Sequence, residues 1–213
     1  MSEYKLHCFA QSGNAYKPAL MLSLCHADWE AVFVDFFNGV TRTDDFRGSV
    51  NEMGEAPILE HEGKKLSQSG AILHYLVRRL GKFGGQNEEE EMEVLRWLLF
   101  DNHKLTSYIA TYRFLTYFMK TGETAVTEFF HARMVGALGV LEKRLTGRCW
   151  VATEELTIAD ISLCGYLFME DEFGISWSDY PAIEAWLNRI KSQDGWSHPY
   201  AMMPGHPLPE RSA

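Results

Sequence analysis

The sequence lacks the features of a membrane protein and of a nucleic-acid-binding protein. No uninterrupted apolar stretch is long enough to cross a bilayer, and the N-terminus does not resemble a signal peptide. Basic residues are few, because 20 Lys and Arg stand against 29 Asp and Glu, for a formal net charge of −9. Binding to phosphate backbones requires a dense basic face. We therefore expect a cytoplasmic protein with neither a nucleic acid nor a membrane as its partner.

Cysteine is also scarce. The four cysteines are widely separated, form no CxxC pair and belong to no His/Cys cluster with metal-ligand spacing. We therefore expect no metal site, and cysteines that are reduced and mostly buried. Cys8, on the first expected strand, has two interpretations, a redox thiol or a small buried apolar residue, and the second is favoured.

The first 80 residues contain alternating strand and helix patterns. Residues 4–9 read as a short strand that ends at the turn formers 11–14, and residues 30–36 are strand-like, rich in β-branched and aromatic residues. The two segments flank an apolar helical pattern, which predicts a βαβ unit. Residues 57–66 predict a β-hairpin with a tight turn at Glu62-Gly63. A helix with one apolar face then extends from residue 68 to Gly81. The order is therefore βαβ–ββα.

The rest of the chain is predicted to be entirely helical. A glycine-rich break at 82–87 is the expected linker between a domain at 1–81 and an all-helical domain at 88–213. The tail from His198 contains four prolines and is not expected to continue a helix. Helical patterns cover residues 89–119 and 124–145, and two more helices begin at Thr157 and Pro181.

A proline opens the first strand of the predicted hairpin. If the peptide bond before Pro57 is cis, the backbone N–H and C=O of Ala56 can pair with an extended peptide ligand, as a further strand would. Gln68 and Ser69, at the start of the next helix, would offer N–H groups and a hydroxyl to a carboxylate. The alternative is a trans Pro57 that merely starts a strand and a Ser69 that only caps a helix.

Two further turns carry helix-start signals. Thr157-Ile-Ala-Asp160 has the spacing of a capping box, which is a purely structural feature. Ser12-Gly13-Asn14 lies where the first strand meets the first helix. A hydroxyl there would donate to a thiolate and lower its pKa, although an ordinary turn has the same composition.

Together these motifs, in this order and over nearly the whole chain, resemble the glutathione transferase superfamily. Ser12-Gly-Asn-Ala-Tyr-Lys17 is similar to the Ser-Gly-Asn-Cys-Tyr-Lys signature of one group of bacterial members. Trp97-Leu-Leu-Phe-Asp-Asn102 and Ile109-Ala-Thr-Tyr-Arg-Phe114 are similar to that group's first C-terminal helix. The resemblance implies a thioredoxin-like α/β N-terminal domain, an all-α C-terminal domain and a homodimer.

The resemblance also implies glutathione as co-substrate and assigns the residues that hold it. Ala56, through the turn at Pro57, would pair with the cysteinyl part, and Gln68 and Ser69 would hold the γ-glutamyl carboxylate. The cation for the glycyl carboxylate is left open. Its candidates are Arg42, Arg47 and Lys17, of which Arg42 is our choice.

The implied activity is that of a detoxifying glutathione transferase, with a possible peroxidase side activity. Ser12 would stabilise the glutathione thiolate, with Asn14 as the rival because a side-chain amide also donates to sulfur. The thiolate would attack a hydrophobic electrophile or a peroxide. An aromatic stripe with Tyr108, Tyr112 and Arg113 would line the electrophile pocket, although such stripes more often belong to a core or a dimer contact.

Two residues depart from the pattern of the resemblance. Ala15 replaces the cysteine of the signature, which removes mixed-disulfide chemistry at that position. Glu55, two residues before Pro57, is an acid where relatives usually carry Lys or Arg. The departures motivate an alternative function, a non-catalytic module of the same fold that binds ligands or proteins.

Overall fold

The computed structural model describes residues 2–209 of the chain and shows two compact units. The first comprises the residues up to Gly84 together with Gln193–His206, and the second comprises Gly85–Ser192 with the residues from Pro207. Each unit is described by itself. The domain limits expected from the sequence, 1–81 and 88–213, remain a prediction, and they did not anticipate that the segment 193–206 packs with the first unit.

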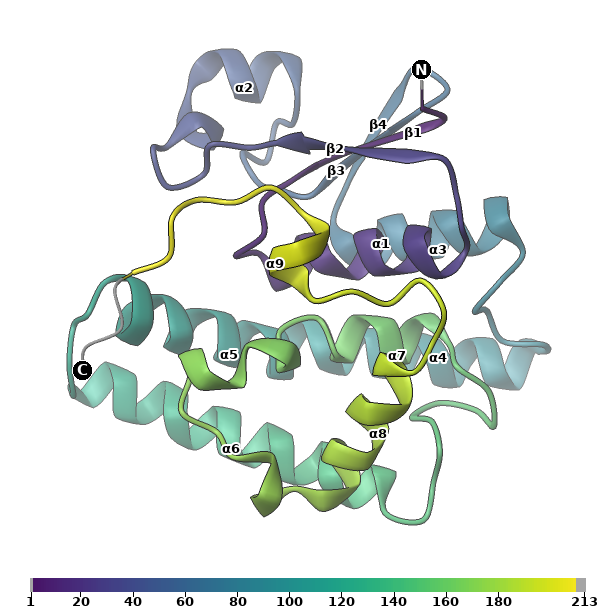
Figure 1. Cartoon of the computed structure of the whole chain (residues 1–213), viewed down its shortest axis with the longest axis vertical. Helices are drawn as coiled ribbons and strands as arrows, with labels where there is room; N and C mark the ends of the chain where they lie inside the picture. Colours follow the sequence, from purple (N-terminus) through teal and green to yellow (C-terminus); the bar gives the residue numbers. More distant parts are fainter. Residues whose placement is uncertain (1, 210–213) are drawn as a thin grey trace. The chain divides into compact units, whose positions relative to one another are not determined.

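A four-stranded sheet in the order β2-β1-β3-β4 forms the centre of the first unit (Figure 1). Its strands are β1 (Tyr4–Cys8), β2 (Trp29–Phe33), β3 (Ile58–His61) and β4 (Lys64–Ser67). β1 pairs parallel with β2 and antiparallel with β3, and β3 pairs antiparallel with β4. The predicted βαβ unit and hairpin therefore join in one mixed sheet, in which β1 and β3 are the central strands.

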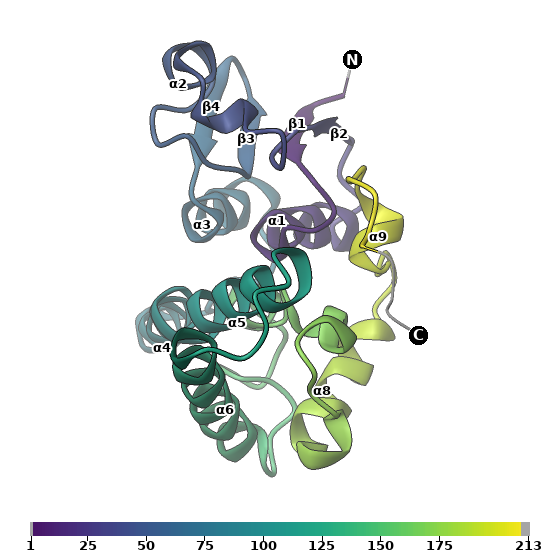
Figure 2. The same cartoon turned by 90° about the vertical axis from the view of Figure 1, so that its left-hand side faces the viewer.

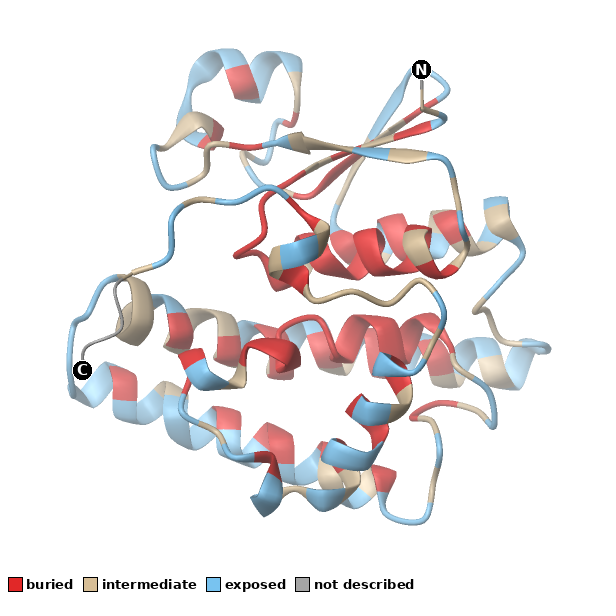
Figure 3. Cartoon of the chain, viewed as in Figure 1, coloured by how far each residue is buried: buried red, intermediate tan, exposed pale blue. Residues whose placement is uncertain are grey.

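Helices α1 (Gly13–Leu24) and α3 (Ser69–Leu80) pack together on one face of this sheet (Figures 1 and 2). Ten of the twelve residues of α1 are buried, and Figure 3 shows this helix buried along nearly its whole length. α3 buries only a stripe and ends at Gly81, whose φ of 65° is the left-handed conformation that the sequence predicts there.

The opposite face of the sheet is covered in part by α2 (Asp44–Ser49), which follows the short turn η1 (Val40–Arg42). Phe46 of α2 packs in a cluster with Phe9, Val34 and Ile58. Most of the other side chains on this face, which come from alternate positions of the strands, are polar. It carries the ion pairs Lys5–Glu30 at 3.0 Å, His7–Glu60 at 2.9 Å and Lys65–Glu60 at 3.4 Å.

The end of the chain differs from the expectation that prolines keep it from being helical. A short helix, α9 (Pro199–Met202), begins at the first of these prolines. Pro199 lies at the first helical position, where a missing N–H costs nothing because that N–H has no partner within a helix. Both views show α9 beside α1 (Figures 1 and 2), and the Tyr16 hydroxyl on α1 donates to the Ser197 carbonyl at 2.8 Å.

The second unit is all-helical, as the sequence predicts. Its elements are α4 (Glu88–Phe100), η2 (Asp101–Leu105), α5 (Thr106–Arg113), η3 (Phe114–Phe118), α6 (Ala125–Leu145), α7 (Ile158–Leu163), η4 (Leu167–Glu172), η5 (Trp177–Asp179) and α8 (Pro181–Lys191). The predicted long helix at 89–119 corresponds to α4 through η3, in which η2 and η3 are wider π-helical turns. Within residues 2–209, no helix combines the length and the apolarity that a membrane span requires.

The capping box predicted at the start of α7 is present. The Thr157 N–H donates to Asp160 Oδ2 at 3.0 Å, and the Thr157 hydroxyl donates to the same oxygen at 3.2 Å. Asp160 Oδ1 also accepts from Val151 N at 2.8 Å and from Trp186 Nε1 at 2.9 Å. The carboxyl is completely buried. Through its hydrogen bonds, this one side chain connects α7, α8 and the loop before α7.

Candidate functional site

Ser12 lies between the end of β1 and the start of α1. It is the N-cap of α1, with extended backbone, and its Oγ accepts a hydrogen bond from Ala15 N at 3.1 Å. A hydroxyl that caps in this way uses a lone pair, and its own hydrogen remains able to donate. The N-terminal N–H groups of α1 place partial positive charge beside it. This turn can therefore stabilise an anion.

Asn14 and Ser69 bring the starts of α1 and α3 together. The Ser69 hydroxyl donates to Asn14 Oδ1 at 3.4 Å, which is a long and weak hydrogen bond. The carbonyl oxygen of the Asn14 amide is therefore occupied on the side of α3, whereas the NH2 group of the same amide is a donor. Three predicted site residues, Ser12, Asn14 and Ser69, thus lie around the first turns of two adjacent helices.

Gln68, at the start of α3, has a strained backbone. Its φ of 69° lies in the left-handed region, which costs a non-glycine residue about 1–3 kcal/mol and occurs mainly at functional sites. Its side-chain amide donates to Glu55 Oε2 at 2.8 Å. The acid that departs from the family pattern therefore contacts the residue assigned to the γ-glutamyl carboxylate. Both side chains are exposed.

The loop before Ala56 is held by a buried amide. Asn51, 3% exposed, donates through Nδ2 to the Glu55 carbonyl at 2.9 Å and accepts from Met53 N at 3.2 Å. The peptide bond between Ala56 and Pro57 is cis, the alternative on which the sequence argument for backbone pairing depended. Asn51 was not among the residues that the sequence analysis selected, because its role depends on a turn of the backbone.

The three cations considered for the glycyl carboxylate differ in exposure. The Lys17 side chain is fully buried on α1, whereas Arg42, at the end of η1, and Arg47, on α2, are exposed. The Arg47 guanidinium lies against Gly54, where an added Cβ would be 2.8 Å from Nη2. Arg47 therefore lies beside the loop that leads to Ala56, which makes it a stronger candidate than the sequence indicates.

Cys8 lies on the buried face of β1. Burial raises the pKa of its thiol to about 12, so its thiolate, the reactive form, is scarce near neutral pH. This argues against the interpretation of Cys8 as a redox thiol and favours that of a small buried apolar residue. Among residues 2–209, His, Cys, Asp and Glu side chains form no group of three or more that could hold a metal ion.

The residues assigned to the electrophile pocket lie on α5 in the second unit. Tyr108 and Tyr112 are half-buried and contact aromatic rings of α6, Phe130 and His131 respectively. Arg113 is buried and donates through Nε to Glu172 Oε2 at 2.8 Å. Its guanidinium therefore belongs to an internal ion pair, and the pocket role of all three residues remains a prediction.

A surface hollow of about 890 Å³ lies on α4. Its lining includes the exposed apolar side chains of Met92, Leu95 and Leu99, together with acidic residues at the start of the helix. None of its lining residues is a predicted site residue. Trp97, on the same helix, is buried inside the second unit.

Two family models match the chain. One, described as the glutathione S-transferase N-terminal domain, matches residues 2–78, and the other, described as the C-terminal domain, matches residues 105–194. The chain belongs to the glutathione S-transferase family. This membership confirms the predicted family and fold, a thioredoxin-like α/β domain with an all-helical C-terminal domain.

Individual relatives of the chain support this membership. The crystal structure of a glutathione S-transferase from Pseudomonas fluorescens superimposes with a TM-score of 0.87 at 35% identity, covering 93% of this chain and 100% of that one. Glutathione S-transferase F14 of Arabidopsis thaliana is 27% identical, over 92% of this chain and 82% of its own. The disulfide-bond oxidoreductase YfcG of Escherichia coli is 28% identical, over 87% of this chain and 89% of its own.

Proposed function

We propose that this family member is a glutathione-dependent transferase whose Ser12 hydroxyl stabilises the glutathione thiolate. The observation that carries the proposal is the double use of Ser12, whose Oγ accepts from Ala15 N at 3.1 Å while its hydrogen can donate. A hydrogen bond to an ionised sulfur favours the ionised form and lowers the thiol pKa. Each unit of pKa corresponds to about 1.4 kcal/mol of preferential stabilisation of the thiolate.

The rest of glutathione would extend from Ser12 toward α3. The cysteinyl backbone pairs with the N–H and C=O of Ala56, and the γ-glutamyl carboxylate binds at Gln68, Ser69 and the first-turn N–H groups of α3. The Ser69–Asn14 hydrogen bond of 3.4 Å supports this direction, because it joins the sulfur end to the carboxylate end. Arg42 or Arg47, both exposed, is available to the glycyl carboxylate.

The reaction with a chloroaromatic substrate illustrates the chemistry. The thiol proton leaves to solvent, the thiolate forms a bond from sulfur to the ring carbon, and chloride departs with the electron pair of the carbon–chlorine bond. The contribution of the protein is to raise the thiolate fraction and to hold both reactants in contact. A peroxide would be attacked by the same thiolate at oxygen.

Calorimetry and steady-state kinetics with a reactive chloroaromatic test the proposal. Ser12→Gly removes the hydroxyl, while glycine is a tolerated N-cap that costs the helix only a few tenths of a kcal/mol. We expect turnover to fall by about 10- to 100-fold, since a hydrogen bond to a charged group contributes about 1.5–3 kcal/mol. Ser12→Thr, which retains a hydroxyl and a cap, should keep most of the activity.

Two further variants separate chemistry from folding. Thr124→Ala removes the N-cap of α6 in the other unit, so it should lower stability by about 1 kcal/mol and leave turnover per folded molecule unchanged. Asn14→Ala tests the rival donor. If Asn14→Ala abolishes turnover and Ser12→Gly does not, the thiol-activating role belongs to Asn14.

The Glu55–Gln68 hydrogen bond favours a second candidate function, ligand binding without turnover. A negative charge beside the carboxylate subsite, with the Gln68 amide already engaged at 2.8 Å, weakens the hold on glutathione. The two functions differ in a single measurement. Saturable glutathione binding with chloroaromatic turnover no faster than the uncatalysed rate would identify the non-catalytic module.

We also propose a homodimer, as the resemblance implies, with the exposed apolar row of α4 at its interface. Met92 and Leu99 are 59% and 61% exposed on this helix, and such rows mark interaction surfaces. Leu99→Glu should shift the sedimentation mass toward that of one 24.4 kDa chain. Val140→Glu, at a similarly exposed apolar position of α6, is the control. A wild-type mass of one chain at micromolar concentration would exclude the dimer.

A further inference from the structure

The segment from Met203 to His206, here called the strap, lies against the end of β1. The Pro204 carbonyl accepts from Ala10 N at 2.8 Å. The Gln11 side chain makes two bonds to the His206 backbone: Nε2 donates to its carbonyl at 2.6 Å, and Oε1 accepts from its N–H at 3.1 Å. The strap therefore pairs with residues 10–11 much as an added strand would.

The strap approaches too closely to admit a side chain at its middle residue. A Cβ on Gly205 would lie 2.8 Å from Ala10 Cβ and 2.9 Å from Gln11 Oε1. Gln11 itself is only 3% exposed. The backbone of the strap at Gly205 thus lies directly against the side chains of Ala10 and Gln11.

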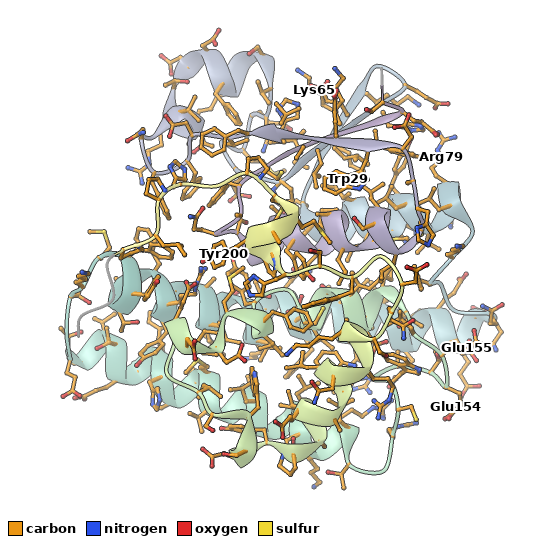
Figure 4. All side chains as sticks on the ribbon, in the orientation of Figure 1. Trp29, Lys65, Arg79, Glu154, Glu155 and Tyr200 are labelled. Atoms are coloured by element: carbon orange, nitrogen blue, oxygen red, sulfur yellow. The ribbon has the colours of Figure 1, made fainter. Side chains whose placement is uncertain are left out.

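Aromatic rings anchor the far end of the strap. The His206 ring lies 4.7 Å from the Phe37 ring and 5.1 Å from the Phe33 ring, measured between centroids, and 6.1 Å from that of Phe9. The preceding segment is fastened through α9, which continues into the strap (Tyr200 on α9 is labelled in Figure 4). Both ends of the strap are therefore held within the first unit.

The strap contacts the two residues that immediately precede Ser12. Ser12 N donates to the Phe9 carbonyl at 3.0 Å, which closes a turn over Ala10 and Gln11. Because the strap bonds to both residues inside this turn, it restricts where the turn, and with it the Ser12 hydroxyl, can lie. A hydrogen bond from a hydroxyl to sulfur depends steeply on such placement.

We propose that the strap is a positioning element for the thiol-activating turn, acting through Gln11 and Gly205 on the direction of the Ser12 hydroxyl. The inference rests on the proposed function of Ser12. It assigns Gln11 as a positioning residue, since Gln11 acts through the turn. The C-terminal segment then contributes to thiol activation from nearly 200 residues away in the sequence.

The test measures the pKa of the glutathione thiol in the complex, from the ultraviolet absorbance of its thiolate as a function of pH. Gly205→Ala forces the strap away from Ala10, and Gln11→Met removes both amide bonds while keeping the length of the side chain. We expect each variant to raise the pKa of the bound thiol by about half a unit to one unit, part of what losing the Ser12 bond entirely would cause. Turnover should fall by about threefold to tenfold, with the KM for glutathione within about twofold of wild type.

A matched control lies in the same C-terminal segment, outside the strap. Gly195 has a φ of 88°, and a Cβ there would lie 2.5 Å from the Ser23 carbonyl oxygen, at the other end of α1. Gly195→Ala should therefore destabilise the protein to urea at least as much as Gly205→Ala does, yet leave the pKa of the bound thiol unchanged. A purely structural role for the strap predicts that the two variants behave alike.

A double variant distinguishes failure of this inference from failure of the proposed function. In a Ser12→Gly background, Gly205→Ala should cause no further rise in the thiol pKa, because the hydroxyl it misplaces is absent. If Ser12→Gly raises the thiol pKa but Gly205→Ala and Gln11→Met do not, the strap inference is wrong and the role of Ser12 stands. If Ser12→Gly leaves the thiol pKa unchanged, both are wrong.

Discussion

Two helices in this chain, α1 and α7, begin with a hydroxyl side chain as N-cap, but the polar groups at the two helix starts differ in how many partners they have. At the start of α7, Asp160 is completely buried and accepts four hydrogen bonds, from Val151, Trp186 and twice from Thr157. At the start of α1, Ser12 accepts one bond, from Ala15, and keeps a hydrogen to donate. The first start is saturated by its own unit, and the second retains hydrogen-bonding capacity.

The difference extends beyond these two turns. In the second unit, Glu93 accepts from Arg96, Trp97 and Arg144. In the first unit, Gln68 lacks a capping bond to α3 and donates to an exposed acid. Saturated polar groups stabilise a fold because burial without partners is costly. Groups with remaining donors are available to a ligand. We therefore expect mutations at a saturated helix start to lower stability, and mutations at an unsaturated one to weaken ligand binding.

The largest expected effect is at Asp160. Asp160→Ala leaves the N–H groups of Val151, Thr157 and Trp186 buried without an acceptor, and each such group costs about 1–3 kcal/mol. We expect a loss of 3 kcal/mol or more in the free energy of unfolding by urea. Asp160→Asn, which keeps one carbonyl oxygen, should lose less. A loss below about 1 kcal/mol for Asp160→Ala would refute the view that this start is saturated for stability.

The second prediction concerns pH and Glu93. Hydrogen bonding to Arg96 lowers the pKa of this carboxyl from its ordinary value of 4.5 to about 2. A depressed pKa adds stability at pH values above the unfolded pKa, and that stability is lost as the pH falls through the folded value. Above about pH 5, we expect Glu93→Gln to be about 1–2 kcal/mol less stable than wild type. This loss is smaller than the full pKa shift would give, because Arg96 is exposed and solvent weakens its interaction with Glu93.

The measurement is urea unfolding at several pH values. The difference between wild type and Glu93→Gln should shrink progressively as the pH falls from about 5 toward about 2. Glu91→Gln, an exposed carboxyl on the same helix, serves as the control with a small and flat difference. A gap that stays constant with pH would show that Glu93 stabilises by packing alone.

The third prediction reverses the pattern, at Ser69. Ser69→Ala loses one long hydrogen bond to Asn14, so the free energy of unfolding should change by less than about 0.5 kcal/mol. The affinity for glutathione should nevertheless fall by about tenfold, which is 1.4 kcal/mol, because the hydroxyl binds the γ-glutamyl carboxylate in the proposed complex. Calorimetry measures the affinity for glutathione, with Ser67→Ala on β4 as the control. Unchanged affinity would remove Ser69 from the site.

The smallest expected effect is at Glu55. Glu55→Gln removes the negative charge beside the Gln68 amide. The side chain at position 55 then competes less strongly with the ligand carboxylate for this amide. We expect glutathione to bind about two to five times more tightly at low salt, and the gain to shrink at high salt because both side chains are exposed. Glu52→Gln, in the same loop, is the control. Weaker binding would mean that Glu55 attracts the ligand, for example by contacting the ammonium group of glutathione.

Local features of the sequence predicted much of the fold and part of the site. The Thr157–Asp160 box, the helix end at Gly81 and the hairpin at 57–66 involve residues a few positions apart, so pattern alone identifies them. The strand–helix junction at Ser12 was found in the same way. The roles proposed for the site residues come from the resemblance, and they stay predictions until tested.

Only the tertiary structure decided the contacts between residues that are far apart along the chain. It showed that residues 193–206 pack with the first unit and bond to Ala10 and Gln11, that Arg113 pairs with Glu172, and that Gln68 donates to Glu55. The physical reason is that periodicity and capping report on neighbours within about one helical turn, whereas these partners meet only when separate elements pack. The sequence by itself determined the family, the βαβ–ββα order of the main elements, and the helix boundaries at Gly81 and Thr157, because each depends on local patterns read in order.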